Sequence, residues 1–482
     1  MIRSFVVIEF FTFIVRTTTI FRRLCLLSLL ATSWLLAQTL PEPIFRAGDR
    51  WAAVGDSITH GGGYHSYVYL YYVTRYPEQK FTMTNAGISG DSAAGAVGRY
   101  DWDIKPFAPT VASIMLGMND VGRGQYSDKP DTPEMAERKK GAIDRHAASM
   151  ATLAQKLRDD QCRLIFITPS IFDQTSTMDK PNNFGVNDAL GICGQKAREL
   201  ATKHDGRVVD FHGAMSALNA KVQQGDPAAT IVGGDRVHPG AAGHLVMAYY
   251  FLKDCGAPKA VTRVEIDAAA SAVRSTLNCQ ADGLSYIGGE MKFNYLAKSL
   301  PFPMPPGTQQ ALAWLPELWN DLCEELLVIK GLPVGEFTLL IDDAIVVTAD
   351  HAAWAAGVNL GQLEKSPMLQ QAGEVMKLND KRHSISSRYL RNFAMWRHGL
   401  SREKDLDFND YDAMLERITA KNAARTSNQG YHNAMAKVYA EHKPREVEYI
   451  KQSQELTDEM WAKAKPLPRR MPLRPALPDE NK

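Results

Sequence analysis

Residues 51–59 read WAAVGDSIT. The first four form a short apolar run that ends at Gly55 and Asp56, a pattern typical of a buried strand entering a turn. Ser57 follows the turn at the expected start of a helix, where unpaired backbone N–H groups favour a developing negative charge. The stretch therefore predicts a strand–turn–helix unit that holds Ser57 exposed.

Strand-like and helix-like segments alternate on both sides of this stretch. Apolar, strand-like runs lie at 81–86, 110–116, 163–168 and 207–211. Helical patterns lie at 64–75, 135–158, 187–203 and 239–252, the last beginning with Pro239. This alternation predicts an α/β fold over residues 45–256, a three-layer α/β/α sandwich with a parallel sheet covered on both faces. In such sheets, sites form at the carboxyl ends of the strands.

Two polar segments follow expected strands. Residues 85–91 read NAGISGD, and their glycines allow close backbone approach to a ligand, so the N–H of Gly90 is a candidate oxyanion donor. Residues 117–120 read GMND, and the Asn119 amide is a neutral donor held by a strand end. Taken singly, each segment is more typical of an ordinary turn than of a site.

A further segment, DRVHP at 235–239, places an acidic residue three positions before a histidine. Asp235 can bond one imidazole nitrogen of His238, which fixes the tautomer and stabilises the imidazolium formed when His238 takes a proton from Ser57. An isolated pair of this kind is also compatible with a metal site or a capped helix start.

The segments together, in this order, resemble the SGNH hydrolase superfamily, also called GDSL-like esterases and lipases, over residues 50–256. The resemblance implies a flavodoxin-like α/β/α sandwich. It also implies Ser57 as nucleophile, His238 as base, Asp235 as its acidic partner, and Gly90 and Asn119 as oxyanion donors. The implied reaction is ester hydrolysis through an acyl-enzyme, with no metal or organic cofactor.

The strand–helix rhythm ends near residue 256. Strand candidates at 285–296, 324–330, 335–341 and 344–347 predict a small β-rich module over 257–365. Residues 366–465 are charged and helical in pattern, so we expect a helical extension there. Residues 466–482 are rich in proline and arginine, and we expect a disordered tail.

The N-terminus has the layout of a secretory signal. Arg22 and Arg23 precede an apolar stretch at 24–37 with a small residue at its end, which predicts a signal peptide over 1–37. The alternative is a signal anchor, although the apolar stretch is short for a membrane span. We therefore expect a secreted or periplasmic protein without stable membrane insertion after removal of the signal.

Charge and cysteine usage exclude several functions. Lys and Arg number 55 against 54 Asp and Glu, so the net charge is +1 and the basic excess of a nucleic-acid-binding protein is missing. The five cysteines beyond the signal are widely spaced, which argues against a zinc site. One or two disulfides are compatible with export, in a pairing that the sequence leaves open.

Other residues near the motifs have ordinary interpretations. His60 and His65 flank three glycines close to Ser57, and we expect surface loop positions or the mouth of a substrate site. The tyrosines at 64–72 and the tryptophans at 314, 319 and 354 fit core packing better than sugar stacking.

The export signal and the appended β-rich module favour a carbohydrate O-acetyl esterase acting on an acylated carbohydrate or another small ester. One alternative is a lysophospholipase or short-chain lipase, for which we expect a long apolar groove. Another is a non-catalytic cell-surface binding protein, because a fold alone does not establish activity.

Overall fold

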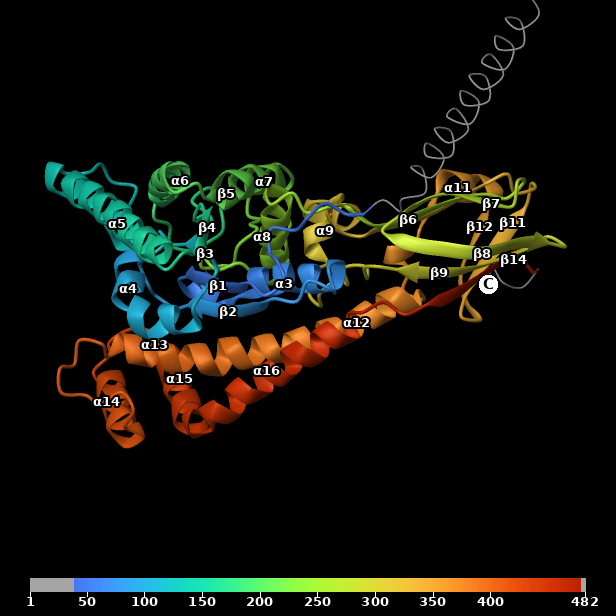
Figure 1. The fold of residues 1–482 in the computed structure, drawn as a ribbon. Coiled ribbons are helices and arrows are strands. Elements are labelled where there is room, and N and C mark those ends of the chain that lie inside the picture. The colour runs from blue at the N-terminus through green and yellow to red at the C-terminus, as the bar shows by residue number, and fades with distance from the viewer. Residues whose placement is uncertain (1–38, 478–482) are drawn as a thin grey trace, which may run out of the picture.

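The computed structural model describes residues 39–477, so the expected signal peptide at 1–37 lies outside the described residues. The described chain comprises an α/β part, a part with two further sheets, and a set of C-terminal helices that lie along the α/β part (Figure 1). The expected fold class, a parallel sheet between helices with added β and helical parts, is confirmed.

The central sheet has five parallel strands in the order β2-β1-β3-β4-β5. These strands are β1 (Arg50–Gly55), β2 (Thr82–Gly87), β3 (Val111–Met115), β4 (Arg163–Ile167) and β5 (Arg207–Val209). The helices on one face are α3 (Gly63–Arg75), α7 (Phe211–Gly225) and α8 (Ala241–Asp254). Those on the other face are α4 (Ala93–Gly98), α5 (Pro133–Asp159) and α6 (Val186–Lys203).

The apolar sequence of β1 follows from this layering. Side chains alternate between the two faces of a strand. Trp51 and Ala53 accordingly join the cluster beneath α3 and α8, whereas Ala52 and Val54 join the cluster beneath α4, α5 and α6. All four are fully buried. A strand covered on both faces is apolar throughout, which is the signal that the sequence carries.

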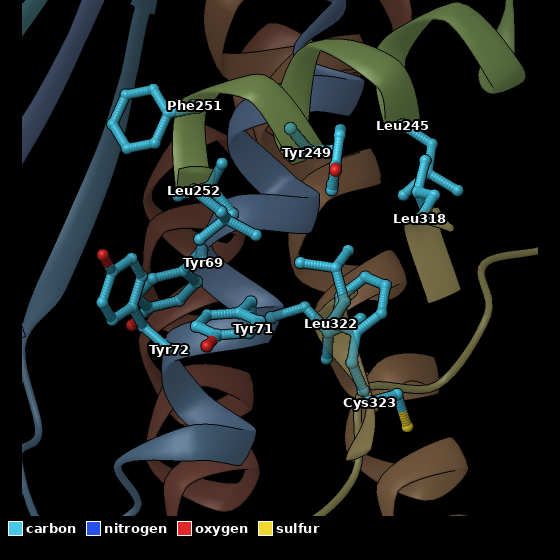
Figure 2. Packing of buried hydrophobic residues seen from close by; sticks show 14 of the residues in the cluster. Tyr69, Tyr71, Tyr72, Leu245, Tyr249, Phe251, Leu252, Leu318, Leu322 and Cys323 are labelled. Carbon is cyan, nitrogen blue, oxygen red and sulfur yellow. The ribbon is translucent and has the colours of Figure 1, made fainter. Parts of the chain in front are cut away.

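The tyrosines of α3 are core residues, as predicted. Tyr69, Tyr71 and Tyr72 are buried and lie beside α8 and beside α10 (Leu318–Leu322), as Figure 2 shows. Their hydroxyls still find partners, since Tyr69 donates to the carbonyl of Phe81 and Tyr71 to that of Pro258. The tyrosine-rich helix therefore joins the α/β part to the segments that follow it.

Two further sheets form the β-rich part. The first has the order β13-β10-β6-β7, with β6 (Ala260–Asp267), β7 (Ala272–Leu277), β10 (Glu324–Lys330) and β13 (Val358–Asn359). The second has the order β12-β11-β14-β9-β8, with β8 (Cys279–Ile287), β9 (Glu290–Ala297), β11 (Glu336–Ile341), β12 (Ala344–Asp350) and β14 (Arg469–Pro475). Short helices α9 (Gln310–Trp314) and α11 (His351–Ala356) complete this part, and Trp354 of α11 is fully buried, as expected for packing.

One strand prediction in this part was wrong. The run at 285–296 is not one strand but the hairpin of β8 and β9. Gly288 and Gly289 form its two-residue turn with φ of +63° and +86°. Positive φ at both central residues is the geometry that such a turn needs, and glycine adopts it without steric cost.

The expectation of a disordered tail over 466–482 was also wrong for its described residues. Residues 469–475 form β14, which pairs with β9 on one side and β11 on the other. Met471 and Leu473 are buried, whereas their neighbours are more exposed. Residues alternate between the two faces of the strand, and the two apolar side chains fill the core beneath the sheet. Their burial stabilises the strand despite the proline and arginine content of the segment.

The C-terminal helices pack against the α/β part. They are α12 (Pro367–Ile385), a π-helical turn (Ser386–Leu390), α13 (Arg391–Gly399), α14 (Tyr411–Ala423), α15 (Gln429–His442) and α16 (Glu446–Lys463). α12 contacts both α3 and α16, and α13 contacts β2. Trp461 of α16 donates its ring N–H to the hydroxyl of Tyr69 at 2.9 Å. The helical part is thus attached to the edge of the central sheet that carries β2 (Figure 1).

Candidate active site

Ser57 is the first residue of α2 (Ser57–Gly61), which begins just beyond the end of β1 at Gly55. Asp56 caps this helix, since its Oδ1 accepts a hydrogen bond from the backbone N–H of Ile58 at 3.0 Å. A Cβ on Gly55 would overlap the side chain of Thr59, so the turn leaves no space for a side chain there. The turn places Ser57 at the carboxyl edge of the sheet, the usual location of sites in such folds.

Ser57, His238 and Asp235 form a chain of hydrogen bonds. Ser57 Oγ and His238 Nε2 are 2.7 Å apart, and His238 Nδ1 and Asp235 Oδ2 are 2.5 Å apart. Asp235 Oδ1 also accepts the backbone N–H groups of Val237 and His238. Because the carboxylate can only accept, Nδ1 carries a hydrogen and Nε2 is free to accept the Ser57 proton.

The loop that carries Asp235 and His238 is held by a residue to which the sequence analysis assigned no role. Arg236 lies between them with a φ of +64° and is buried. Its guanidinium donates to the backbone carbonyls of residues 173, 176, 178, 180 and 181. These bonds hold the positive-φ backbone of Arg236 in place, and with it the loop in which Asp235 bonds to His238 and His238 bonds to Ser57. The residue type alone gave no signal of this role.

The carboxyl groups of the site have opposite pKa shifts. Burial raises the pKa of Asp235, but hydrogen bonds from the His238 ring and from the N–H groups of His238 and Val237 outweigh it, and the pKa lies below its ordinary value. Asp235 is therefore ionised at neutral pH and accepts the hydrogen that His238 Nδ1 carries. Burial raises the pKa of Asp56 to about 7, which the hydrogen bond from Ile58 and the charge of His238 only partly offset.

Gly90 and Asn119 lie in the loops after β2 and β3. Gly90 has a φ of +79°, and no heavy atom lies within 4 Å of where a Cβ would be, so its backbone borders open space. Asn119 donates one amide hydrogen to the carbonyl of Asp91 at 2.8 Å. Its second amide hydrogen remains available for another acceptor. The two candidate donors are therefore linked through the residue that follows Gly90.

The sheet brings these segments to one edge. In the register of the sheet, Gly55 of β1 lies beside Gly87 of β2 and Met115 of β3. The residues that follow each strand end are therefore neighbours, as expected from parallel pairing. The arrangement supplies a hydroxyl, a base with an acidic partner and hydrogen-bond donors. These are the groups that nucleophilic acyl transfer requires.

The expectation that His60 and His65 are surface loop residues was wrong. Both are buried, with 6% and 1% of their surface exposed. His60 Nδ1 accepts from the backbone N–H of Ser89, and its Nε2 donates to the carbonyl of Ser387 in the π-helical turn. Burial is the main cause that lowers the pKa of His60 to about 4, so the ring is neutral. The covering residues come from the far end of the chain, which is why local sequence gave no signal of burial.

The cysteines form no disulfide within residues 39–477. The five that lie there are all free and buried: Cys162, Cys193, Cys255, Cys279 and Cys323. In the same range, no group of three or more His, Cys, Asp or Glu side chains is arranged to hold a metal ion. No helix between residues 39 and 477 has the length and apolar character needed to cross a membrane.

Comparison with known proteins gives consistent matches. The family model of the GDSL-like lipase/acylhydrolase family matches residues 53–246. An acetylxylan esterase from Geobacillus stearothermophilus is 29% identical over 225 residues, which are 44% of this chain and 95% of that protein. The solved structure of a gut microbial diltiazem-metabolizing enzyme is 30% identical, with a TM-score of 0.81, over 91% of this chain and 100% of that chain.

The similarity to the last of these extends over the α/β part, the β-rich part and the helical part together, because it covers nearly the whole chain. The four sequence segments, the fold and these matches agree. The chain belongs to the SGNH hydrolase superfamily of GDSL-like acylhydrolases, and it is a serine ester hydrolase.

Proposed function

We propose that the chain removes O-acetyl groups from carbohydrates, through an acetyl-enzyme formed on Ser57. The observation that carries the proposal is the hydrogen-bonded chain from Ser57 Oγ to His238 and from His238 to Asp235. In this proposal Ser57 is the nucleophile, His238 the general base and acid, and Asp235 the residue that orients and stabilises the imidazolium.

The first half of the reaction forms the acetyl-enzyme. Ser57 Oγ attacks the carbonyl carbon of the ester while its proton passes to His238 Nε2, 2.7 Å away. The carbonyl oxygen becomes an oxyanion, and the backbone N–H groups of Ser57 and Gly90 and the amide of Asn119 donate to it. The carbon–oxygen bond to the alcohol then breaks, and His238 returns the proton to the leaving alcohol.

The second half regenerates the enzyme. Water attacks the acetyl carbonyl and gives its proton to His238, and the same donors stabilise the second tetrahedral intermediate. The bond to Ser57 Oγ breaks as His238 reprotonates the serine, and acetate leaves. Asp235 stays ionised throughout, in keeping with its lowered pKa.

Two observations support a short acyl group on a large polar alcohol. The side chains of His238 and Asp235 are 47% and 53% exposed, which fits an open site better than a deep apolar acyl groove. The relative from Geobacillus stearothermophilus is an acetylxylan esterase that matches this chain over nearly its own full length. A bulky carbohydrate fits an open site, whereas a long acyl chain needs enclosure to bury its surface.

The test is a series of p-nitrophenyl esters. The purified protein should hydrolyse the acetate, the butyrate poorly and the octanoate least, and it should release acetate from acetylated xylooligosaccharides. Ser57→Ala should abolish all of these activities. As a matched control, Ser299→Ala removes a buried hydroxyl that bonds to the Arg75 carbonyl, and it should leave kcat within about threefold of wild type.

The outcomes separate the rival functions. A preference for octanoate would contradict the acetyl proposal and favour a lipid ester as substrate. Wild-type protein that is folded but inactive on every ester would favour a binding role. Hydrolysis that survives Ser57→Ala would remove Ser57 from the mechanism.

We also propose that the protein is exported, on the basis of the charged and apolar pattern at 22–37. N-terminal sequencing of the protein isolated from the expressing cell should find a start close to residue 38. An intact Met1 would contradict export with signal cleavage.

A further inference from the structure

The loop of Gly87–Asp91 is covered by the C-terminal helical part, along a segment that we call the docking segment (residues 386–400). This segment comprises the π-helical turn, α13 and Leu400. α13 lies beside β2 and below α4, so it reaches the loop that connects the two (Figure 1). The loop holds Gly90, a proposed oxyanion donor, and its contacts with the docking segment decide how firmly that donor is held.

Arg391 binds the start of the loop. Its Nε donates to the carbonyl of Gly87 at 2.9 Å, and its two terminal nitrogens bind the two carboxylate oxygens of Asp103 at 2.8 Å each. Burial raises the pKa of Asp103, but Arg391 and Arg99 outweigh it and hold that pKa far below its ordinary value. A guanidinium in this bidentate geometry fixes both distance and angle, which an ammonium group does not.

Further ion pairs connect Asp103 to Asp91, at the end of the Gly87–Asp91 loop. Arg99 is paired with Asp103, and its Nε donates to Asp91 Oδ2 at 2.8 Å. Arg99 also donates to the carbonyl of Ala86 at 2.8 Å. Two arginines and two aspartates thus form a buried chain of alternating charge from Gly87 to Asp91. Each buried charge has an opposite partner, so removal of one leaves its neighbour unpaired at high cost.

His398 contacts Asp91 from the docking segment. Its Nε2 lies 3.2 Å from Asp91 Oδ1, and a Cβ on Gly95 would overlap the same oxygen. The backbone carbonyl of Asp91 accepts the Asn119 amide at 2.8 Å. His398 therefore touches the residue on which Asn119 rests, and both proposed oxyanion donors depend on where Asp91 lies.

The middle of the loop is held by different forces. Ile88 is 1% exposed and belongs to the apolar core of the helical part, together with Phe393, Trp396 and Leu400. Ser89 bonds to His60, which in turn donates to the carbonyl of Ser387. Of the loop residues, Gly90 borders the open space described above, so the loop is held on both sides of the proposed donor.

We propose that Arg391 and His398 are positioning residues for ester hydrolysis, and that the docking segment holds the Gly87–Asp91 loop in the geometry that stabilises the oxyanion. This inference rests on the proposed function. Neither side chain needs to touch the substrate. A displacement of the loop by about 1 Å moves the Gly90 N–H and the Asn119 amide off the oxyanion, and misplacement of that size costs on the order of 10²-fold in rate.

The test compares kcat and KM of Arg391→Met, Arg391→Lys and His398→Ala on p-nitrophenyl acetate. Oxyanion donors act in the transition state more than in the bound substrate, so kcat should fall by about 10–100-fold while KM stays within about threefold. Arg391→Lys should recover only part of the loss, because it keeps the charge without the bidentate geometry. Thermal unfolding of each variant establishes that it is folded at the assay temperature.

Arg382→Met is the matched control. Arg382 lies in α12 of the same helical part and is similarly buried, but it bonds to Asn379 and lies over the Tyr69 ring, away from the loop. This variant should melt at a lower temperature and keep kcat within about threefold of wild type. An equal loss of kcat in Arg382→Met would contradict a positioning role, since general destabilisation would then explain the effect.

The remaining outcomes distinguish this inference from the proposed function. If wild type hydrolyses the ester, Ser57→Ala does not, and Arg391→Met and His398→Ala keep their kcat, the positioning role is overturned while the function stands. If Arg391→Met does not fold, His398→Ala decides, because His398 is partly exposed and its removal leaves the charge chain intact. Activity that survives Ser57→Ala overturns the proposed function and this inference with it.

Discussion

Replacement of Asp56 by asparagine tests the electrostatics next to Ser57. Asp56 is 2% exposed, and its Oδ1 accepts the N–H of Ile58 at 3.0 Å. An asparagine side chain caps a helix as well as an aspartate does. Asp56→Asn therefore keeps the hydrogen bond and removes only the ionisation.

The magnitude follows from the pKa. Burial raises the pKa of Asp56 from 3.8 to about 7 in the folded protein. The unfolded chain therefore releases this proton at lower pH than the folded chain, and the folded state loses stability as the pH rises from about 4 to about 7. A difference of about 3 pKa units corresponds to at most about 4 kcal/mol. The asparagine side chain does not titrate, so the advantage of Asp56→Asn over wild type should grow with pH by up to that amount over the whole range, and by about 2–3 kcal/mol between about pH 5 and about pH 8.5.

The assay is urea unfolding of both proteins at about pH 5 and about pH 8.5, with tryptophan fluorescence as the signal that monitors unfolding. Other titrating groups cancel because the two proteins are compared at the same pH. Asp173→Asn is the control: burial raises the pKa of Asp173, but hydrogen bonds from Thr230, Ser176 and other groups outweigh it and keep the pKa below its ordinary value. Asp173 is therefore ionised in the folded and in the unfolded chain at both pH values, and the difference in stability between Asp173→Asn and wild type should be the same at both. A pH-independent difference between Asp56→Asn and wild type would refute the reasoning.

Three further predictions concern separate parts of the chain. Asn119→Ala should lower kcat by about 10²–10³-fold in initial-rate assays, and a loss below about threefold would remove Asn119 from the oxyanion site. Leu473→Ala in β14 should lower the free energy of urea unfolding by about 2–5 kcal/mol, because Leu473 is fully buried. Val334→Ala, at a residue that is 89% exposed, should change the free energy of unfolding by less than about 0.5 kcal/mol. Equal losses in Leu473→Ala and Val334→Ala would contradict the burial of β14. Iodoacetamide should alkylate the five buried cysteines only after unfolding, and a peptide-mapped disulfide would contradict their free state.

The α/β part was predictable because its signals are local. β1 is apolar from Trp51 to Val54 and ends at Gly55, and the same change from apolar strand to glycine-containing loop recurs at Gly87 and Gly117. A histidine three residues after an aspartate places both on one short loop, so their hydrogen bond follows from spacing. Parallel pairing then brings the loops to one edge without any further information.

The contacts that the sequence did not reveal are long-range. β14 fills a place between β9 and β11 that exists only once β9 has paired with β8 and β11 with β12, so composition suggested a disordered tail. Arg391 and Asp103 are 288 positions apart, and no local pattern indicates that they form an ion pair. The burial of His60 likewise depends on Ser387, which lies 327 positions away. These contacts form only when the C-terminal helices pack against the α/β part, and the local periodicity of the sequence does not indicate that packing.

The most direct test of the central claim is to react the folded protein with diisopropyl fluorophosphate and map the modified residue by peptide mass spectrometry. An activated serine displaces fluoride and retains the phosphoryl group, whereas an ordinary serine does not react. We predict a single modification on Ser57, loss of esterase activity in proportion to it, and no modification in His238→Ala. Modification of another serine, or full activity after complete modification of Ser57, would contradict the account.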